Sequence, residues 1–109
     1  MQYKVILTKS AATDIEHIAD YIAVNLRERQ TALKMVRKIR ETAMSLQTMP
    51  EKYPVVQDNF LALKGVRMVT INHYLMFYTV DHAKGIVSVL NVVYGKREWI
   101  SFLTEQFKN

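Results

Sequence analysis

Apolar positions in the first half of the chain repeat at the spacing of α-helices. The stripe of the first stretch consists of Ile15, Ile18, Ala19, Ile22 and Leu26. The stripe of the second stretch consists of Ala32, Val36, Ile39, Ala43 and Leu46. The pattern predicts two amphipathic helices that form an antiparallel hairpin, with the break within residues 25–29. We expect Ser10 to cap the first helix, and Pro50 and Pro54 to end the second.

Runs of β-prone residues occupy the N-terminus and the second half of the chain. These runs are residues 3–7, 66–71, 74–80 and 86–93. Asn72 and His73 separate two of the runs by the length of a tight hairpin, and Asn tolerates a positive φ. The run at residues 86–93 is the most continuously apolar, which predicts a central place in the sheet.

The tail between Glu98 and Phe107 returns to helical spacing. Its apolar positions are Trp99, Phe102, Leu103 and Phe107, which predict a short amphipathic helix. The order of elements is therefore β-α-α-β-β-β-α. It predicts a single α+β domain over residues 1–109, with a helical hairpin packed on one face of a mainly antiparallel four-stranded sheet.

Composition narrows the class of protein. The chain has 109 residues and no cysteine, which excludes disulfide frameworks, thiolate zinc sites and a thiol nucleophile. Apolar runs fall far short of the ~18 residues of a membrane span, so we expect no membrane partner. Residues 1–9 carry Lys4 and Lys9 and read as a strand, whereas a signal peptide would be apolar there. We therefore expect a cytoplasmic protein.

The net charge of +5 is concentrated in the second helix. Residues 27–41 carry six basic and two acidic side chains, whereas residues 1–26 carry two basic and three acidic ones. This distribution favours a polyanion or an acidic protein as partner. The alternative is a lysine- and arginine-rich face that only keeps the helix solvated.

The sequence lacks the common motifs for metals and phosphates. His17, His73 and His82 have no paired spacing, and three isolated glycines cannot form a phosphate loop. No Gly-x-Ser-x-Gly motif is present. We therefore expect no metal and no other cofactor.

Basic and aromatic residues gather around the predicted sheet instead. They are Lys64, Arg67, Tyr74, Tyr78, Tyr94, Lys96 and Arg97. If the strands are neighbours, these groups can converge on one surface, where Arg binds phosphate and Tyr stacks or supplies a proton. The alternative for Tyr74 and Tyr78 is a half-buried place in the sheet. The alternative for Arg97 is a pair with Glu98 at the start of the last helix.

The motifs of the chain and their order resemble the RelE/ParE superfamily of bacterial type II toxins. The resembling parts are Asp14-Ile15-x-x-Ile18-x-x-Tyr21-Ile22, then Leu46 with Pro50 and Tyr53, then Arg67 ahead of His73-Tyr74-Leu75-Met76-Phe77-Tyr78-Thr79-Val80-Asp81, and Val92-Val93-Tyr94-Gly95-Lys96-Arg97-Glu98-Trp99. They cover nearly the full chain in order. The resemblance implies a toxin that a cognate acidic antitoxin neutralises.

Two mechanisms are open within this superfamily. RelE-like members enter the ribosome and cut mRNA without a metal, and ParE-like members poison DNA gyrase. The helix-one motif is more typical of ParE-like members, whereas the basic second helix and the set Lys64, Arg67, Lys96 and Arg97 suit contact with RNA. A ribosome-dependent endoribonuclease is the first expectation, with gyrase inhibition as the alternative. The resemblance implies catalytic roles for Arg67, Arg97 and Tyr94. The expected substrate-binding residues are Lys64, Lys96, Arg37 and Arg40. No general base is identified, because His73 lies in a turn and Glu98 adjoins Arg97.

Overall fold

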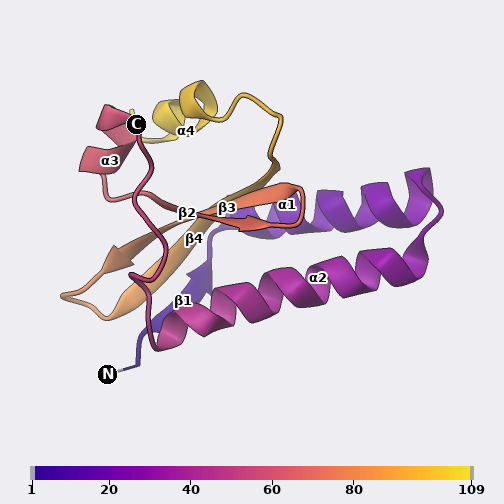
Figure 1. The fold of residues 1–109 in the computed structure, drawn as a ribbon, viewed down its shortest axis with the longest axis horizontal. Coiled ribbons are helices and arrows are strands. Elements are labelled where there is room, and N and C mark those ends of the chain that lie inside the picture. Colours follow the sequence, from indigo (N-terminus) through magenta and orange to yellow (C-terminus); the bar gives the residue numbers. More distant parts are fainter. Residues whose placement is uncertain (1, 109) are drawn as a thin grey trace.

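A computed structural model describes residues 2–108 of the chain. The elements in order are β1 (Lys4–Leu7), α1 (Lys9–Asp20), a π-helical turn η1 (Tyr21–Asn25), α2 (Arg29–Met44), a 3-10 turn η2 (Ser45–Gln47), α3 (Asn59–Leu63), β2 (Arg67–Ile71), β3 (Tyr74–Asp81), β4 (Ile86–Tyr94) and α4 (Ile100–Gln106). Figure 1 shows α1 and α2 as an antiparallel hairpin whose free end extends past the sheet. The predicted α+β class is confirmed.

The four strands form one sheet in the order β1-β4-β3-β2. The pairs β2–β3 and β3–β4 are antiparallel, and β1 pairs with β4 in parallel. The sheet is therefore mainly antiparallel, and β4 lies inside it between two neighbours, as its apolar run predicts. Asn72 occupies the β2–β3 turn with a φ of 54°, which confirms the predicted hairpin.

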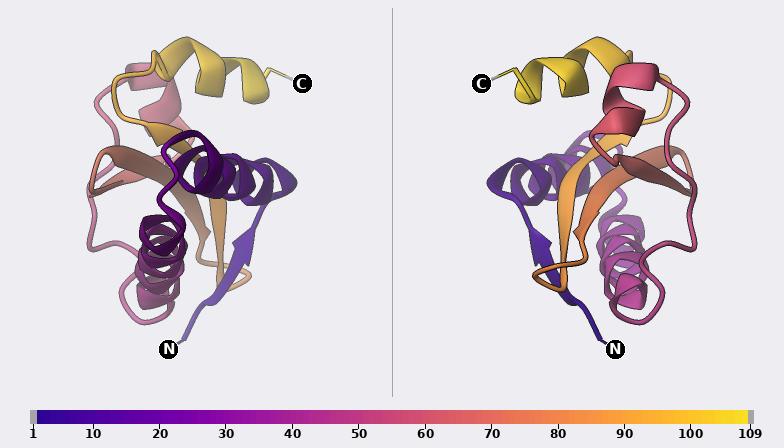
Figure 2. Two further views of the ribbon diagram at one scale, coloured as in Figure 1. Left: turned by 90° about the vertical axis from the view of Figure 1, so that its right-hand side faces the viewer. Right: turned by 90° about the vertical axis from the view of Figure 1, so that its left-hand side faces the viewer.

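The sheet separates two apolar clusters. The larger cluster lies between the sheet and the helical hairpin and includes Ile39, Leu46 and Tyr78. The smaller cluster lies under α3 and α4 and includes Leu61, Phe77 and Leu103. Figure 2 shows the two short helices on the side of the sheet opposite the hairpin. Leu103 is fully buried, so the apolar stripe of the tail belongs to a core.

The N-terminal cap of α1 differs from the prediction. Thr8, and not Ser10, is the cap, and its hydroxyl oxygen accepts a hydrogen bond from Ala11 N at 3.1 Å. The same hydroxyl group lies 2.9 Å from Val89 O in β4. A contact with a distant strand therefore sets the start of the helix, and local capping preference alone does not identify it.

The end of α2 also precedes the predicted stop signals. The α-helix ends at Met44 and continues as the 3-10 turn to Gln47, so Pro50 lies beyond both. The short helix α3 is absent from the sequence prediction because five residues are too few to show a period. Asp58 caps it by accepting from Leu61 N at 3.1 Å. None of the helices within residues 2–108 combines the length and apolar character that a membrane crossing requires.

Candidate functional site

A groove runs between the helical hairpin and one end of the sheet. Its volume is about 810 Å³, and it is lined by the hairpin, by the β2–β3 turn and by the end of β4. The hairpin contributes apolar side chains such as Ile18, Ile22 and Leu26, and Tyr74 and Tyr94 form the wall contributed by the sheet. An apolar groove with a few polar groups at its edge is suited to an amphipathic peptide segment.

Asp14 fixes the relation between the hairpin and β4 at this groove. Its Oδ2 accepts hydrogen bonds from Asn91 Nδ2 at 2.9 Å and from Val92 N at 3.0 Å. The strand is irregular here, because Phe77 pairs with Asn91 while Tyr78 pairs with Val89. The extra residue brings both Val89 and Val92 into the larger core and leaves Asn91 buried. Asp14 thus supplies the buried amide with a partner.

Tyr74 and Tyr94 pack edge to face in the groove, with ring centroids 5.9 Å apart. Burial raises the pKa of Tyr74 above 10.0, and the neighbouring phenols of Tyr21 and Tyr94 raise it further. Tyr74 therefore stays protonated at neutral pH, and its hydroxyl group can donate a hydrogen bond but does not act as a base.

A tight turn places Arg97 beside these tyrosines. Gly95 N donates to His73 O at 2.8 Å, and a Cβ at Gly95 would lie 3.1 Å from that same oxygen. This close approach brings the chain after β4 against the β2–β3 turn. Arg97 then stacks over the ring of Phe102, with its Cζ 4.4 Å from the ring centroid. Glu98 does not form an ion pair with it, because its carboxylate accepts from Ile100 N and Ser101 N at the start of α4.

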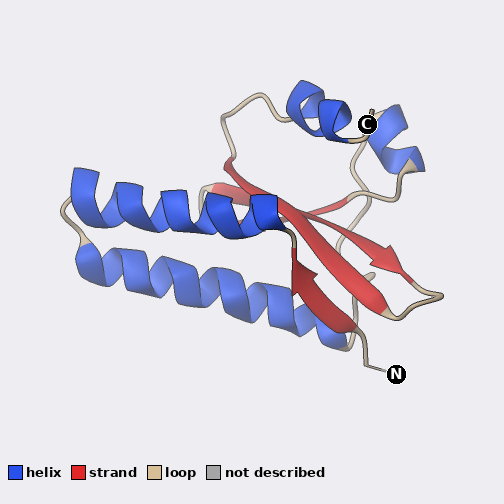
Figure 3. Ribbon diagram, turned by 180° about the vertical axis from the view of Figure 1, so that it is seen from behind, coloured by secondary structure: helices blue, strands red, loops and turns tan. Residues whose placement is uncertain are grey.

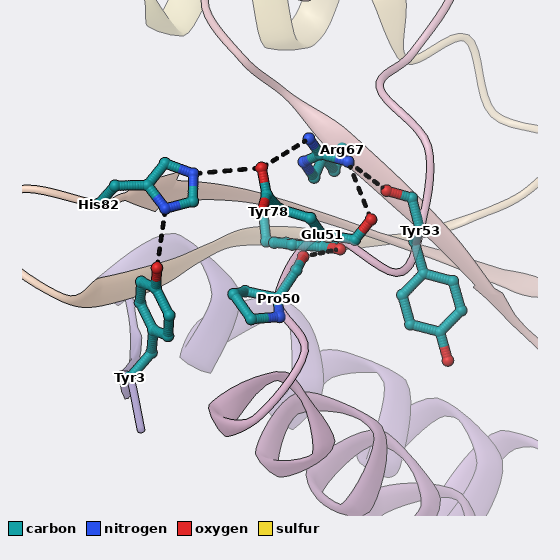
Figure 4. A network of polar contacts seen from close by, with 7 residues as sticks. All are labelled: Tyr3, Pro50, Glu51, Tyr53, Arg67, Tyr78 and His82. Atoms are coloured by element: carbon teal, nitrogen blue, oxygen red, sulfur yellow. Dashed lines mark hydrogen bonds and ion pairs between the residues drawn. The ribbon is translucent and has the colours of Figure 1, made fainter. Parts of the chain in front are cut away.

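Arg67 lies at the start of β2, away from Arg97, in the network shown in Figure 4. It pairs with Tyr78 in the middle of β3, whereas Tyr94 pairs with Tyr74 at the first residue of β3. These two positions are four residues apart along β3, which corresponds to roughly 13 Å. Arg67 Nη1 donates to Tyr53 O at 2.6 Å and, at 3.3 Å, to the carbonyl oxygen of Glu51. The guanidinium therefore supports the loop after α2.

Three further side chains, those of Glu51, His82 and Tyr3, join this network, and the sequence pattern assigned none of them to a site. Glu51 Oε2 lies 3.6 Å from Arg67 Nη2 and 3.3 Å from His82 Nε2. Tyr3 OH lies 2.8 Å from His82 Nδ1. These residues come from the N-terminal end, the loop after α2, β2 and the β3–β4 turn. No local sequence pattern connects them, so only the folded chain reveals the group.

The remaining predicted site residues lie in separate places. Lys64 follows α3 and lies over the ring of Phe60. Lys96 is exposed in the turn after β4. Arg37 and Arg40 are exposed on α2, outside the groove. The structure therefore brings Tyr94, Lys96 and Arg97 into one region, and it separates them from Arg67, from Lys64 and from the α2 pair.

Within residues 2–108, the His, Asp and Glu side chains form no group of three or more that could hold a metal ion.

Comparison with known proteins identifies a family. Residues 5–99 match the family described as the ParE toxin of a type II toxin–antitoxin system, parDE. Among curated proteins, no sequence matches the chain significantly.

Similar folds occur in solved structures of toxins. The chromosomal ParDE system from P. aeruginosa is 23% identical with a TM-score of 0.70, and the match covers 85% of this chain and 96% of that one. A RelE toxin variant from E. coli in the free state is 11% identical with a TM-score of 0.69 over 100% of both chains. The RelBE2 complex from Mycobacterium tuberculosis is 21% identical with a TM-score of 0.61, covering 86% and 99%.

Proposed function

The chain belongs to the family of ParE toxins of type II toxin–antitoxin systems, and from this membership we propose that it arrests growth by binding DNA gyrase. In this proposal the toxin inhibits supercoiling and catalyses no reaction of its own. Membership in the wider RelE/ParE superfamily agrees with the resemblance found in the motifs.

The observation that supports this proposal most is the separation of the two arginines expected to act on RNA. A phosphoryl-transfer site requires its cations around one phosphate. Arg67 pairs with Tyr78, four residues along β3 from the Tyr74–Tyr94 pair that Arg97 follows, and Arg67 is held by two main-chain oxygens. Within residues 2–108, no carboxylate forms an ion pair with Arg97. This arrangement suits a binding surface better than a site for in-line attack.

A second candidate function has one specific observation in its favour. Glu51 and His82 flank Arg67, so a carboxylate, an imidazole and a guanidinium meet at one point. These are the groups that a metal-independent endoribonuclease requires as general base, general acid and phosphate contact. Ribosome-dependent mRNA cleavage is therefore the alternative to gyrase inhibition.

A side-by-side assay separates the two functions. Purified chain is added to a gyrase supercoiling reaction and to a purified translation system. We expect blocked supercoiling with accumulation of linear DNA, and intact mRNA. Full gyrase activity at excess toxin would overturn the proposal, and mRNA cut within codons would establish the second candidate.

Variants of the Arg67 network sharpen this comparison. Glu51→Gln and His82→Gln change exposed side chains and remove the titratable groups of the second candidate. We expect both variants to inhibit gyrase as the parent chain does. A loss of growth arrest in both variants, with normal folding, would favour cleavage.

The toxin is further proposed to bind its antitoxin through the groove beside the hairpin. A chain of net charge +5 attracts an acidic partner. The groove offers apolar wall residues to a segment that folds on binding, with Leu26 and Tyr94 partly exposed at its edge. Such a segment would lie between the hairpin and the end of the sheet.

Antitoxin binding is testable with a matched pair of substitutions. Leu26→Asp changes a residue that lines the groove, and Val24→Asp makes the same kind of change on the same turn outside it. We expect Leu26→Asp to weaken the Kd roughly tenfold or more and Val24→Asp to leave it unchanged. Calorimetric titration with the cognate antitoxin measures both. Equal Kd values for the two variants would argue against the groove.

A further inference from the structure

Helix α2 carries an exposed stripe of basic and apolar side chains beside its buried face. At about 100° per residue, positions 29, 33, 37, 40 and 44 fall within an arc of about 80°. The members of this α2 stripe are Arg29, Leu33, Arg37, Arg40 and Met44. All five side chains are exposed, with Leu33 at 55% and Met44 at 49%. The buried face of the helix, which includes Met35 and Ile39, is centred roughly 115° away around the helix axis.

The arginines of the α2 stripe are free of polar partners in the described part of the chain. Within residues 2–108, the side chains of Arg29, Arg37 and Arg40 form no hydrogen bond, ion pair or stacking contact. The groove near Tyr74 lies on the other side of the helix, where Thr31 and Met35 line it. Figure 3 shows α2 at the edge of the molecule, extending with α1 past the sheet. The stripe is therefore open to a partner over roughly 22 Å of helix.

The composition of the α2 stripe distinguishes a protein partner from a nucleic acid. Arg and Met are enriched at the centres of protein interfaces and Lys is depleted, and the stripe holds three Arg, one Met and no Lys. A phosphate backbone provides positive side chains with counter-charges but leaves Leu33 and Met44 uncovered. Spacings of three and four along the helix are typical of a helix that docks in a groove.

We infer that the α2 stripe is the surface through which the toxin contacts gyrase, docking in an acidic, partly apolar groove on that enzyme. This inference rests on the proposed function and adds the contact surface to it. Leu33 and Met44 supply the apolar anchors, and Arg37 and Arg40 between them pair with carboxylates on the target. The antitoxin groove and the α2 stripe are then two separate binding surfaces of one small domain.

The test compares charge reversals inside and outside the stripe. Arg37→Glu and Leu33→Glu change the stripe, and Lys34→Glu makes the same charge change as Arg37→Glu, on the same helix but about 60° away. Each variant is titrated in the gyrase supercoiling assay and for gyrase binding. Circular dichroism and antitoxin affinity show that each variant is folded. We expect roughly a tenfold or greater loss of inhibition for the stripe variants and none for Lys34→Glu.

The other outcomes overturn the inference in different ways. Equal losses for Arg37→Glu and Lys34→Glu, with a steep dependence on salt, would indicate a polyelectrolyte contact with nucleic acid. Parent-like inhibition by both stripe variants would overturn this inference and leave the proposed function standing. A parent chain that leaves gyrase fully active would overturn both.

Discussion

Tyr78 joins the centre of the sheet to the loop after α2 through one buried hydroxyl group. Its side chain is fully buried, and its OH donates to Pro50 O at 2.7 Å (Figure 4). Burial raises the pKa of Tyr78 from 10.0 to about 12, although the Arg67 charge and a main-chain hydrogen bond oppose the shift. The folded chain therefore holds the phenol proton more tightly than the unfolded chain does.

The raised pKa of Tyr78 predicts that the free energy of unfolding falls at alkaline pH. Between pH 10 and about 12, the unfolded phenol ionises while the folded one stays neutral, so the free energy of unfolding falls by roughly 2–3 kcal/mol. Tyr78→Phe lacks this component, and below pH 10 it is less stable by about 1–2 kcal/mol because Pro50 O loses its donor. Urea unfolding of both proteins from pH 9 to 11 measures the difference. A difference that does not vary with pH would contradict the prediction.

Substitution of Asp14 is expected to lower the free energy of unfolding. Within residues 2–108 the Oδ1 of Asn91 has no partner, so Asp14 supplies the only polar contact of that buried side chain. Asp14→Ala also leaves Val92 N unpaired, and we expect a loss of about 2–4 kcal/mol. Asp14→Asn should lose less, because an amide oxygen still accepts both bonds. Denaturant unfolding tests this, with exposed Glu16→Ala as a control expected to stay within about 0.5 kcal/mol.

Long helices and strands were predictable from the sequence, and short elements were not. The hairpin helices show helical stripes over three turns or more, and strands β3 and β4 are sufficiently apolar to be recognised from composition. Helix α3 is too short for a period, and it forms because Leu61 inserts into the smaller core while Asp58 caps it. The start of α1 at Thr8 likewise depends on β4. These boundaries follow from tertiary contacts that no local window contains.

A residue in the turn between α1 and α2 offers a site for a stabilising substitution. Arg27 adopts a φ of 53°, a conformation that costs a residue with a Cβ about 1 kcal/mol. Arg27→Gly should therefore raise the melting temperature by a few degrees. Lys34→Gly, at an exposed position in the interior of α2, should lower it because Gly weakens a helix interior. Calorimetry on both variants measures the change in melting temperature. A lower melting temperature for Arg27→Gly would contradict this prediction.

At the scale of the whole molecule, positive charge is distributed over different faces. The α2 stripe carries Arg29, Arg37 and Arg40, and the groove carries Arg97 at its edge. A net charge of +5 speeds the approach of acidic partners to either surface. The fold keeps the two surfaces on different sides of α2, which permits separate contacts with antitoxin and target.

This separation predicts how salt affects the antitoxin complex. Its Kd should weaken as salt rises from about 50 to 300 mM, because the screening length falls below ~10 Å in this range. The double variant Arg37→Glu/Arg40→Glu should show the same salt dependence as the control Lys34→Glu/Lys84→Glu, which lowers the net charge equally at exposed positions, since all four side chains lie outside the groove. Titration calorimetry at several salt concentrations measures both. A flatter dependence in Arg37→Glu/Arg40→Glu than in the control would place the antitoxin on the α2 stripe.

The sequence by itself determined the class of fold, the order of the long elements, the central position of β4 and the superfamily. These properties depend on spacings of two and 3.6 residues and on motifs in chain order, which are local. The tertiary structure decided which side chains meet. Strand register separated Arg67 from Arg97, and the packing of the loop after α2 and the β3–β4 turn joined Arg67 to Glu51 and His82. The irregularity in β4 lies where Asp14 pairs with Asn91. Such contacts depend on residues distant in sequence, because strand pairing and helix packing set them together.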